Sequence, residues 1–242
     1  STGIEIGDAD TNALPASCTG ACNVISGNES GIYYFKGTSA SNDNVIEGNF
    51  IGVDKTGEFQ VTNNYGVRAS KVSNLSINYN MIASVVSSVY AQAEASAVIS
   101  NITVDNNYIG INRSGDTVLM DSDNAIWLYS SLVSSLTTAN VTNNIIVGAV
   151  RGSGINVQGV NTSGVSIKSN YIGTNSADAG LGNKYGIYFL SPNATNNVIG
   201  GANPADGNII ANNDSYGIYL YATVNTLTRN NTINNNGNDG IL

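Results

Sequence analysis

One short pattern, an apolar residue followed three positions later by Asn and five positions later by Ile, recurs along most of the chain. Its six copies begin at Ile46, Ile77, Val104, Val141, Ile167 and Thr228, the last with Thr at the apolar place. Such self-similarity is typical of repeat proteins, in which each unit buries little surface alone and stacks on its neighbours. The pattern disfavours separate globular domains and predicts one repetitive domain over residues 1–242.

A second series of short strands predicts the length of the repeat. These strands open with Gly-Ile or a close variant, at residues 3, 31, 66, 124, 154, 186, 217 and 240. One more coil must fit into the Ala/Ser-rich stretch 85–100. The series corresponds to about nine coils of about 30 residues each. A longer motif, Asn-aromatic-Ile-Gly, starts at Asn49, Asn107 and Asn170, and so marks every second coil.

The composition fits β-structure and excludes a helical bundle or coiled coil. Asn, Gly, Ser, Val and Ile are abundant, whereas charged residues make up only 11%. Asn and Gly are poor helix formers, and β-branched residues favour strands. Because alternate residues of a strand point to the same side, each coil directs its apolar residues into a narrow core. We therefore expect an all-β fold, a parallel β-solenoid.

The Asn of each repeat predicts a ladder along one turn of the solenoid. It follows a short strand, where its side chain can hydrogen-bond the backbone and where a left-handed conformation is tolerated. In stacked coils these amides would bond to one another. The expected ladder contains Asn49, Asn80, Asn107, Asn144 and Asn170. The Ile two residues later should form one buried column: Ile51, Ile82, Ile109, Ile146, Ile172 and Ile233.

Several segments resemble the repeats of a known fold family. They are residues 22–28, residues 44–54, and residues 197–201 with 207–210. These strings look like right-handed parallel β-helix repeats of the pectin-lyase-like superfamily, which occur in large bacterial secreted and cell-surface proteins. The resemblance implies a right-handed parallel β-helix. It does not specify an activity, because this fold carries lyases, hydrolases, epimerases, adhesins and inert stalks.

Charge and cysteine content restrict the partners and the compartment. The net charge is −8, and nine Lys and Arg are scattered singly, which argues against nucleic-acid binding. No apolar run approaches the ~20 residues that a membrane span needs. Cys18 and Cys22 lie four residues apart, and we expect them to form a disulfide across a surface turn, with two free thiols as the alternative. A disulfide and scarce charge indicate a secreted or cell-surface protein.

Residues with catalytic chemistry are few. The chain has no His, so it lacks the His-containing motif of polygalacturonase-like members of the superfamily. Pectate-lyase-like members use acidic calcium ligands with an Arg or Lys base. Asp121 and Asp123 form the only close acidic pair, and Arg151 follows about one coil later. Paired carboxylates can bind calcium or divide acid and base roles, but Asp-Ser-Asp-Asn also reads as an ordinary turn.

Two further segments, residues 54–57 and 112–115, read as calcium or sugar loops or, more simply, as β-turns with Asp or Asn first and Gly fourth. The sequence therefore predicts no cofactor and no metal, with calcium as the alternative.

A third feature is aromatic. In each Gly-Ile-x-aromatic strand the x residue points outward, and so does the residue two positions later. The aromatic residues at these places are Tyr33, Phe35, Trp127, Tyr129, Tyr188, Tyr219 and Tyr221.

Stacked coils would align these rings as a stripe, which suits binding of sugars or protein partners; the alternative is a cross-strand ladder that stabilises the sheet. The expected function is a non-catalytic extracellular segment: a stalk, an adhesin or a filament-forming unit, with a polysaccharide or cell-surface partner. The alternative is a polysaccharide-active enzyme, a lyase or glycoside hydrolase, that uses Asp121, Asp123 and Arg151. Because polar capping segments are lacking at residues 3–6 and 240–242, we further expect either a segment of a longer solenoid that continues at both ends or copies that stack head to tail.

Overall fold

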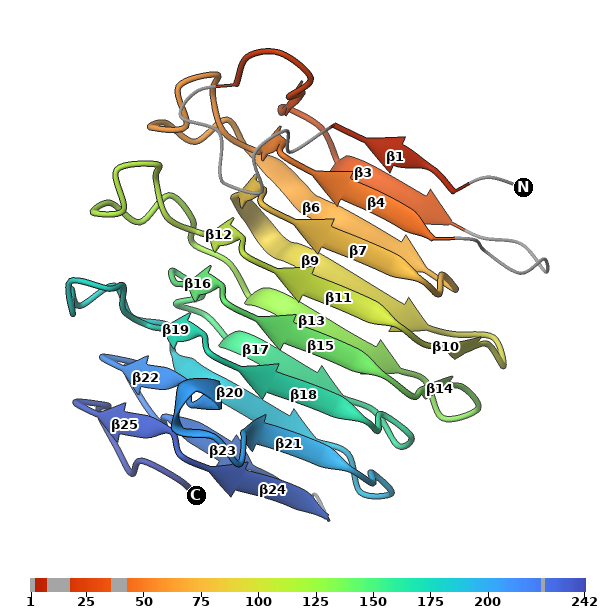
Figure 1. Ribbon diagram of the computed structural model, residues 1–242, viewed down its shortest axis with the longest axis vertical. Helices are drawn as coiled ribbons and strands as arrows, with labels where there is room; N and C mark the ends of the chain where they lie inside the picture. Colours follow the sequence, from red (N-terminus) through yellow and green to blue (C-terminus); the bar gives the residue numbers. More distant parts are fainter. Residues whose placement is uncertain (1–2, 8–17, 36–42, 223–224) are drawn as a thin grey trace.

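The computed structural model describes residues 3–7, 18–35, 43–222 and 225–242, and these residues form three long parallel sheets. The chain visits sheets A, B and C in turn and repeats this circuit along the long axis of the molecule (Figure 1). Each circuit is called a coil below. The arrangement is all-β and consistent with a parallel β-helix, as the sequence predicted.

Sheets A and B each contain eight strands among the described residues, and sheet C contains seven. Sheet A consists of β1 (Glu5–Ile6), β4 (Asn44–Glu47), β7 (Leu75–Asn78), β11 (Ile102–Asp105), β15 (Ala139–Thr142), β18 (Val165–Lys168), β21 (Asn197–Gly200) and β24 (Thr226–Arg229). Sheet B consists of β2 (Val24–Ile25), β5 (Phe50–Ile51), β8 (Met81–Ile82), β12 (Tyr108–Ile109), β16 (Ile145–Ile146), β19 (Tyr171–Ile172), β22 (Ile209–Ala211) and β25 (Thr232–Asn234). Sheet C consists of β3 (Ser30–Phe35), β6 (Asn63–Ser70), β9 (Ser84–Ala93), β13 (Asn124–Ser130), β17 (Ser153–Gln158), β20 (Tyr185–Leu190) and β23 (Ile218–Leu220).

Two short elements lie outside these sheets. Strands β10 (Val98–Ile99) and β14 (Ser135–Leu136) pair with each other at the turn that leads from sheet C to sheet A. A single 3-10 turn, η1 (Pro204–Asp206), lies between β21 and β22.

The first described strand lies in sheet A, whereas the sequence pattern placed Gly3 in the same series as the strands that start at residues 31 and 66. The Gly-Ile series identifies strands of sheet C, but Gly3 precedes β1, which pairs with β4 in sheet A. Gly3 therefore does not belong to the sheet C series, and sheets A and B each have eight strands among the described residues. The Ala/Ser-rich stretch does contain the missing strand, since β9 pairs with β6 on one side and β13 on the other.

The core is a column of aliphatic side chains inside the coils. The six predicted Ile residues occupy the second position of successive strands of sheet B, with Ile210 of β22 between the last two, which confirms that prediction. All but Ile233 are buried; Ile233 is partly exposed, because β25 is the edge strand of sheet B, so the predicted burial fails at that position. Sheet C leaves room for this column with glycine. At Gly186, an added Cβ would lie 2.4 Å from the carbonyl oxygen of Gly217 and 2.6 Å from Ile210 Cγ2.

A continuous ladder of Asn side chains fixes the turn from sheet A to sheet B. Each Oδ1 accepts hydrogen bonds from the backbone N–H and the Nδ2 of the Asn in the preceding coil, at 2.8 to 3.2 Å. The ladder contains Asn23, Asn49, Asn80, Asn107, Asn144, Asn170, Asn208 and Asn231. All five residues predicted from the sequence lie in it and are buried.

The positive-φ backbone conformation of this turn belongs to the residue before the ladder Asn. Gly48, Tyr79, Asn106, Asn143 and Ser169 have φ values between 53° and 68°. The sequence pattern assigned both the side-chain hydrogen bonds and the left-handed backbone conformation to one Asn. In the structure two neighbouring residues provide them. The ladder residue points inward, and its Nδ2 also donates to the carbonyl oxygen two residues back.

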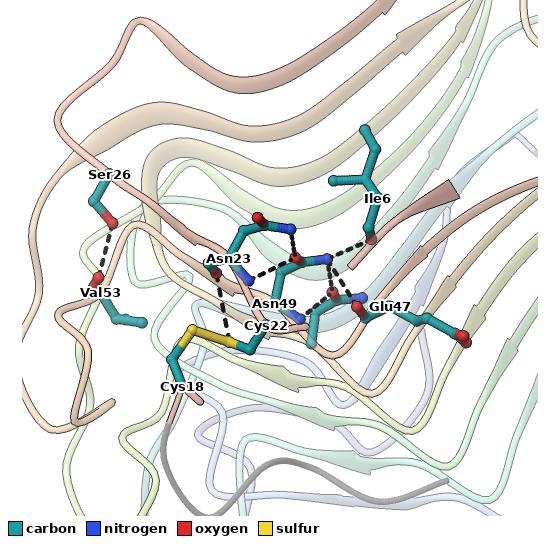
Figure 2. The surroundings of a disulfide bond; sticks show 9 residues. Ile6, Cys18, Cys22, Asn23, Ser26, Glu47, Asn49 and Val53 are labelled. Carbon is teal, nitrogen blue, oxygen red and sulfur yellow. Dashed lines mark hydrogen bonds between the residues drawn. A yellow bond between two sulfur atoms is a disulfide. The ribbon is translucent and has the colours of Figure 1, made fainter. Parts of the chain in front are cut away.

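The disulfide ties the first coil to this ladder. Cys18 and Cys22 are bonded, as Figure 2 shows, and Asn23 donates from both its backbone N–H and its Nδ2 to Asn49 Oδ1. The backbone N–H of Cys18 also donates to the carbonyl oxygen of Lys55. The bridge thus holds the segment before β2 against the loop that follows β5.

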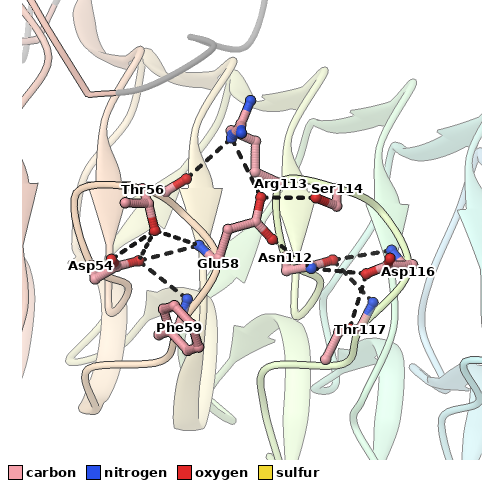
Figure 3. A network of polar contacts seen from close by, with 9 residues as sticks. All are labelled: Asp54, Thr56, Glu58, Phe59, Asn112, Arg113, Ser114, Asp116 and Thr117. Carbon is pink, nitrogen blue, oxygen red and sulfur yellow. Dashed lines mark hydrogen bonds and ion pairs between the residues drawn. The ribbon is translucent and has the colours of Figure 1, made fainter.

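Loops on alternate coils cover the outer face of sheet B. Phe50 and Met81 point outward from this sheet, yet both are fully buried, because Gly57 of the loop after β5 lies over them. The next loop extends this cover: Arg113 N donates to the Gly57 carbonyl oxygen at 2.9 Å, and Arg113 Nε lies 3.5 Å from Glu58 Oε1 (Figure 3). One loop therefore covers two coils, which explains why Asn-aromatic-Ile-Gly marks every second coil.

The Ile column predicts a large loss of stability on truncation. Ile109→Ala should lower the free energy of unfolding by about 2–5 kcal/mol, because neighbouring coils restrict relaxation around the cavity. Thr103→Ala, which changes a partly exposed residue on β11, serves as the control and should cost less than about 1 kcal/mol. Chemical denaturation followed by circular dichroism measures both. Equal losses would contradict a stacked core.

The Asn ladder predicts that removal of a buried amide lowers the free energy of unfolding more than removal of an exposed one. Asn107→Leu leaves the Asn80 N–H and Nδ2 groups without their acceptor, so the free energy of unfolding should fall by about 1–3 kcal/mol. Asn140→Leu, at an exposed position of β15, is the matched control and should have little effect. Melting temperatures that agree for the two variants would argue against the ladder.

Candidate functional site

The outer face of sheet C carries the aromatic residues that the sequence singled out. Strand register places one residue from each of the seven strands in a single column, which we call the aromatic column. It contains Tyr33, Arg68, Tyr90, Trp127, Asn156, Tyr188 and Tyr219. The next outward position holds Phe35, Ser70, Gln92, Tyr129, Gln158 and Leu190 on β3 to β20. Tyr221 follows β23, and its N–H donates to the Phe189 carbonyl oxygen.

Sequence reasoning missed four aromatic residues of this face. Tyr90 lies on β9, whose Ala/Ser-rich sequence lacks the Gly-Ile marker. Tyr65, Tyr185 and Tyr216 precede the glycine of their strands, so the marker gave them no place. All four make ring contacts within the face.

The rings in the N-terminal half of the face stack on one another along the molecule. Tyr90 and Trp127, on neighbouring strands, have ring centroids 4.5 Å apart and planes only 16° apart. Tyr65 lies 6.0 Å from Tyr90 at 20°. Near-parallel rings at the spacing of neighbouring strands cover one another's faces. These side chains therefore direct their edges, rather than their faces, toward solvent.

Cations of the same chain occupy further ring faces. The Arg68 guanidinium carbon lies 5.0 Å from the ring centroid of Tyr33, 5.2 Å from that of Tyr65 and 6.0 Å from that of Tyr90. Lys71 and Lys184 lie 5.3 Å and 5.5 Å from the rings of Phe35 and Tyr185. Each such contact contributes about 0.5–1 kcal/mol at an exposed site.

The C-terminal half of the face is a cluster of tyrosines in which one ring differs in orientation. Tyr185 and Tyr216 are nearly parallel, at 4°. Tyr188 is inclined by 54° to Tyr185 and by 76° to Tyr219. Burial, followed by the neighbouring phenols, raises the pKa of Tyr188 above its usual value.

A recess separates the two aromatic halves. At β17 the aromatic column holds Asn156, and Ser153 and Gln158 flank it on the same strand. The recess has a volume of about 280 Å³ and is walled by Tyr185 and Tyr188. Its other lining residues are Asp123, Asn124, Arg151, Gly152, Ser153 and Asn156.

The three residues of the predicted alternative catalytic group meet at the edge of this recess. Arg151 Nη1 lies 3.3 Å from Asp121 Oδ2, and Arg151 Nε lies 2.9 Å from Asp123 Oδ1. Arg151 Nη2 also donates to the Val85 carbonyl oxygen. The side chains are between 45% and 65% exposed, so the ion pairs are solvated ones. The arginine lies between the carboxylates and compensates the charge that would attract a cation.

Asp54 and Asp116, in the loops that cover sheet B, accept hydrogen bonds from residues of their own loops. Burial opposes the charge of Asp54, but hydrogen bonds from Thr56 and from the N–H groups of Phe59 and Glu58 outweigh it and lower its pKa (Figure 3). A hydrogen bond from Asn112 lowers the pKa of Asp116. In the described part of the chain, no three Asp, Glu, Cys or His side chains lie together as metal ligands would.

A larger recess, about 470 Å³, lies at the opposite end of the sheet C strands, among the turns that lead to sheet A. Its lining contains Ser134, Thr137, Asn161 and Ser163, and it includes no aromatic ring and no charge. We therefore take the sheet C recess as the candidate site. Among the described residues, no helix has the length and apolarity needed to cross a membrane.

Comparison with known proteins finds no relative of this chain: no family model matches it, and neither a curated protein nor a solved structure is significantly similar.

The stacking of Tyr90 between Tyr65 and Trp127 predicts that this tyrosine ionises at an unusually high pH. Tyr90 is 8% exposed, and burial, with smaller effects from its charged neighbours, raises its pKa to about 12. An unfolded chain ionises tyrosine near pH ~10. The contribution of the neutral, buried Tyr90 phenol to the free energy of unfolding is therefore complete below that pH, and it is lost as the pH rises from about 10 to about 12. Ultraviolet difference absorbance of phenolate should show a group that titrates near pH ~12 and that Tyr90→Phe removes. Identical titration curves would contradict the burial of this phenol.

Proposed function

We propose that the chain is a non-catalytic segment of a right-handed parallel β-helix, of pectin-lyase-like fold, from a secreted or cell-surface protein, and that it binds a glycan through the outer face of sheet C. The carrying observation is the aromatic column interrupted by a polar recess, because aromatic rings beside amide and hydroxyl groups suit sugars. Parallel strands with crossover connections are almost always right-handed, which supports the handedness. The disulfide is compatible with an oxidising compartment.

A polysaccharide lyase or glycoside hydrolase is the second candidate. It is favoured by one observation, the convergence of Asp121, Asp123 and Arg151 at the recess. Incubation with plant, algal and bacterial polysaccharides, assayed for reducing ends and unsaturated products, separates the two. We expect no products. Turnover that falls in Asp121→Ala, Asp123→Ala and Arg151→Ala would establish the enzyme instead.

Trp127 provides a direct test of binding, because it is the sole Trp of the chain and pairs in register with Asn156. Its fluorescence should change on titration with a bound glycan. Trp127→Ala should weaken binding at least tenfold by calorimetry, while the circular dichroism spectrum keeps its β form. Leu132→Ala, at a 78% exposed position after β13, is the control and should bind normally. Unchanged affinity in Trp127→Ala would place the binding surface elsewhere.

A further inference from the structure

The orientation of the rings restricts where a sugar can bind on sheet C. A sugar ring packs its C–H groups against the face of an aromatic ring, where the π-system is electron-rich. In the aromatic column, Tyr90 has Trp127 stacked on one side and Tyr65 on the other. Arg68 lies against the same group. These rings stabilise the sheet, and they do not offer a run of open faces along the molecule.

At β17 the aromatic column is interrupted by Asn156, and ring surface beside this interruption lines the recess. Tyr185 is nearly parallel to Tyr216 of the next coil and has Lys184 over its ring, and it borders the recess at β17, where Ser153 has a small side chain. Tyr188 forms the second wall at an angle of 54°. Two inclined ring walls above a polar floor form a recess for a compact ring with an apolar face and a polar edge.

The floor contains a hydrogen-bonding group with an unused acceptor. Asn156 Nδ2 donates to Asn124 Oδ1 at 3.1 Å, but Asn156 Oδ1 is buried and has no partner among the described residues. Buried polar atoms are rarely left without a partner, so each exception requires an explanation. A ligand hydroxyl that donates to Asn156 Oδ1 supplies one here.

Charge and size define the ligand further. Arg151 is paired with both Asp121 and Asp123, and Lys184 lies over the Tyr185 ring, so the two cations and two carboxylates leave the surroundings of the recess without a net charge that would select an anion or a cation. Its volume of about 280 Å³ lies just below the ~300–1,000 Å³ of sites for drug-sized ligands. That volume suits one sugar ring rather than a stretch of polymer.

We infer that the break in the aromatic ladder at β17 is a binding site for a single uncharged sugar residue, the end or a branch of a glycan, which enters the recess end-on. The inference rests on the proposed glycan-binding function and restricts it. It also assigns a ring with neighbours stacked on both sides, such as Tyr90, to stability rather than to recognition, whereas Trp127 is the register neighbour of Asn156.

The test uses the whole chain, isotopically labelled, with methyl glycosides of neutral hexoses as probes in nuclear magnetic resonance titrations. At least one probe should bind with millimolar affinity and shift amide signals of β13, β17 and β20. Asn156→Leu and Tyr188→Ala should each weaken binding at least tenfold. The circular dichroism spectra of Asn156→Leu and Tyr188→Ala should keep the β form, which separates lost recognition from lost folding.

Tyr33→Ala is the matched control, because Tyr33 belongs to the same column, is 52% exposed and lies four strands away from β17. It should bind every probe normally. Binding of only long oligosaccharides, weakened equally by Tyr33→Ala, would overturn the single-residue site and leave the proposed function intact. A preference for oligouronates with calcium would overturn the uncharged ligand. Failure of every saccharide to bind would overturn the glycan-binding function as well.

Discussion

Every coil of this protein has to leave sheet A at the same point as the coil before it, and the buried Asn ladder enforces that condition. Each Asn accepts two hydrogen bonds from the Asn of the preceding coil and donates to backbone carbonyl groups, as Asn107 does to Ile77 and Asp105. A shift of one residue would place a different side chain, such as Phe50 or Tyr108, where the amide belongs and leave several buried polar groups unpaired, at about 1–3 kcal/mol each. The ladder thus sets the register on which the core column depends.

The ladder tolerates large differences in coil length because it acts at one turn only. Successive members are separated by 26, 31, 27, 37, 26, 38 and 23 residues. The variation falls in the loops between sheets. After β5 the extra residues fold back over the apolar outer side of sheet B, and Gly57 of this loop covers the buried Phe50 and Met81. The outer face of sheet B is therefore buried at β5 and β8 and partly exposed at β12 and β19, whereas the aromatic column on the outer face of sheet C is at least partly exposed at every position except Tyr90.

The aromatic face of sheet C combines two tasks that compete for the same rings. Stacking of Tyr90 on Trp127 contributes to the stability of neighbouring coils and removes their shared faces from contact with a ligand. The polar interruption at Asn156 gives up one step of that stacking and creates the recess. Stability and recognition are in this way assigned to different strands of one surface.

The sequence by itself determined the stacked architecture, because the Asn and Ile markers repeat with the chemistry that a buried turn and a narrow core require. It also identified the outward places of Tyr33, Trp127, Tyr188 and Tyr219, since alternation along a strand needs no knowledge of neighbours. The tertiary structure decided the rest. The assignment of Gly3 to sheet A, the position of β9 in sheet C and the stacking of Tyr90 on Trp127 depend on which coils lie side by side. The ion pairs of Arg151 with Asp121 and Asp123 and the recess beside them depend on side-chain orientations between coils, which a pattern along one chain does not contain.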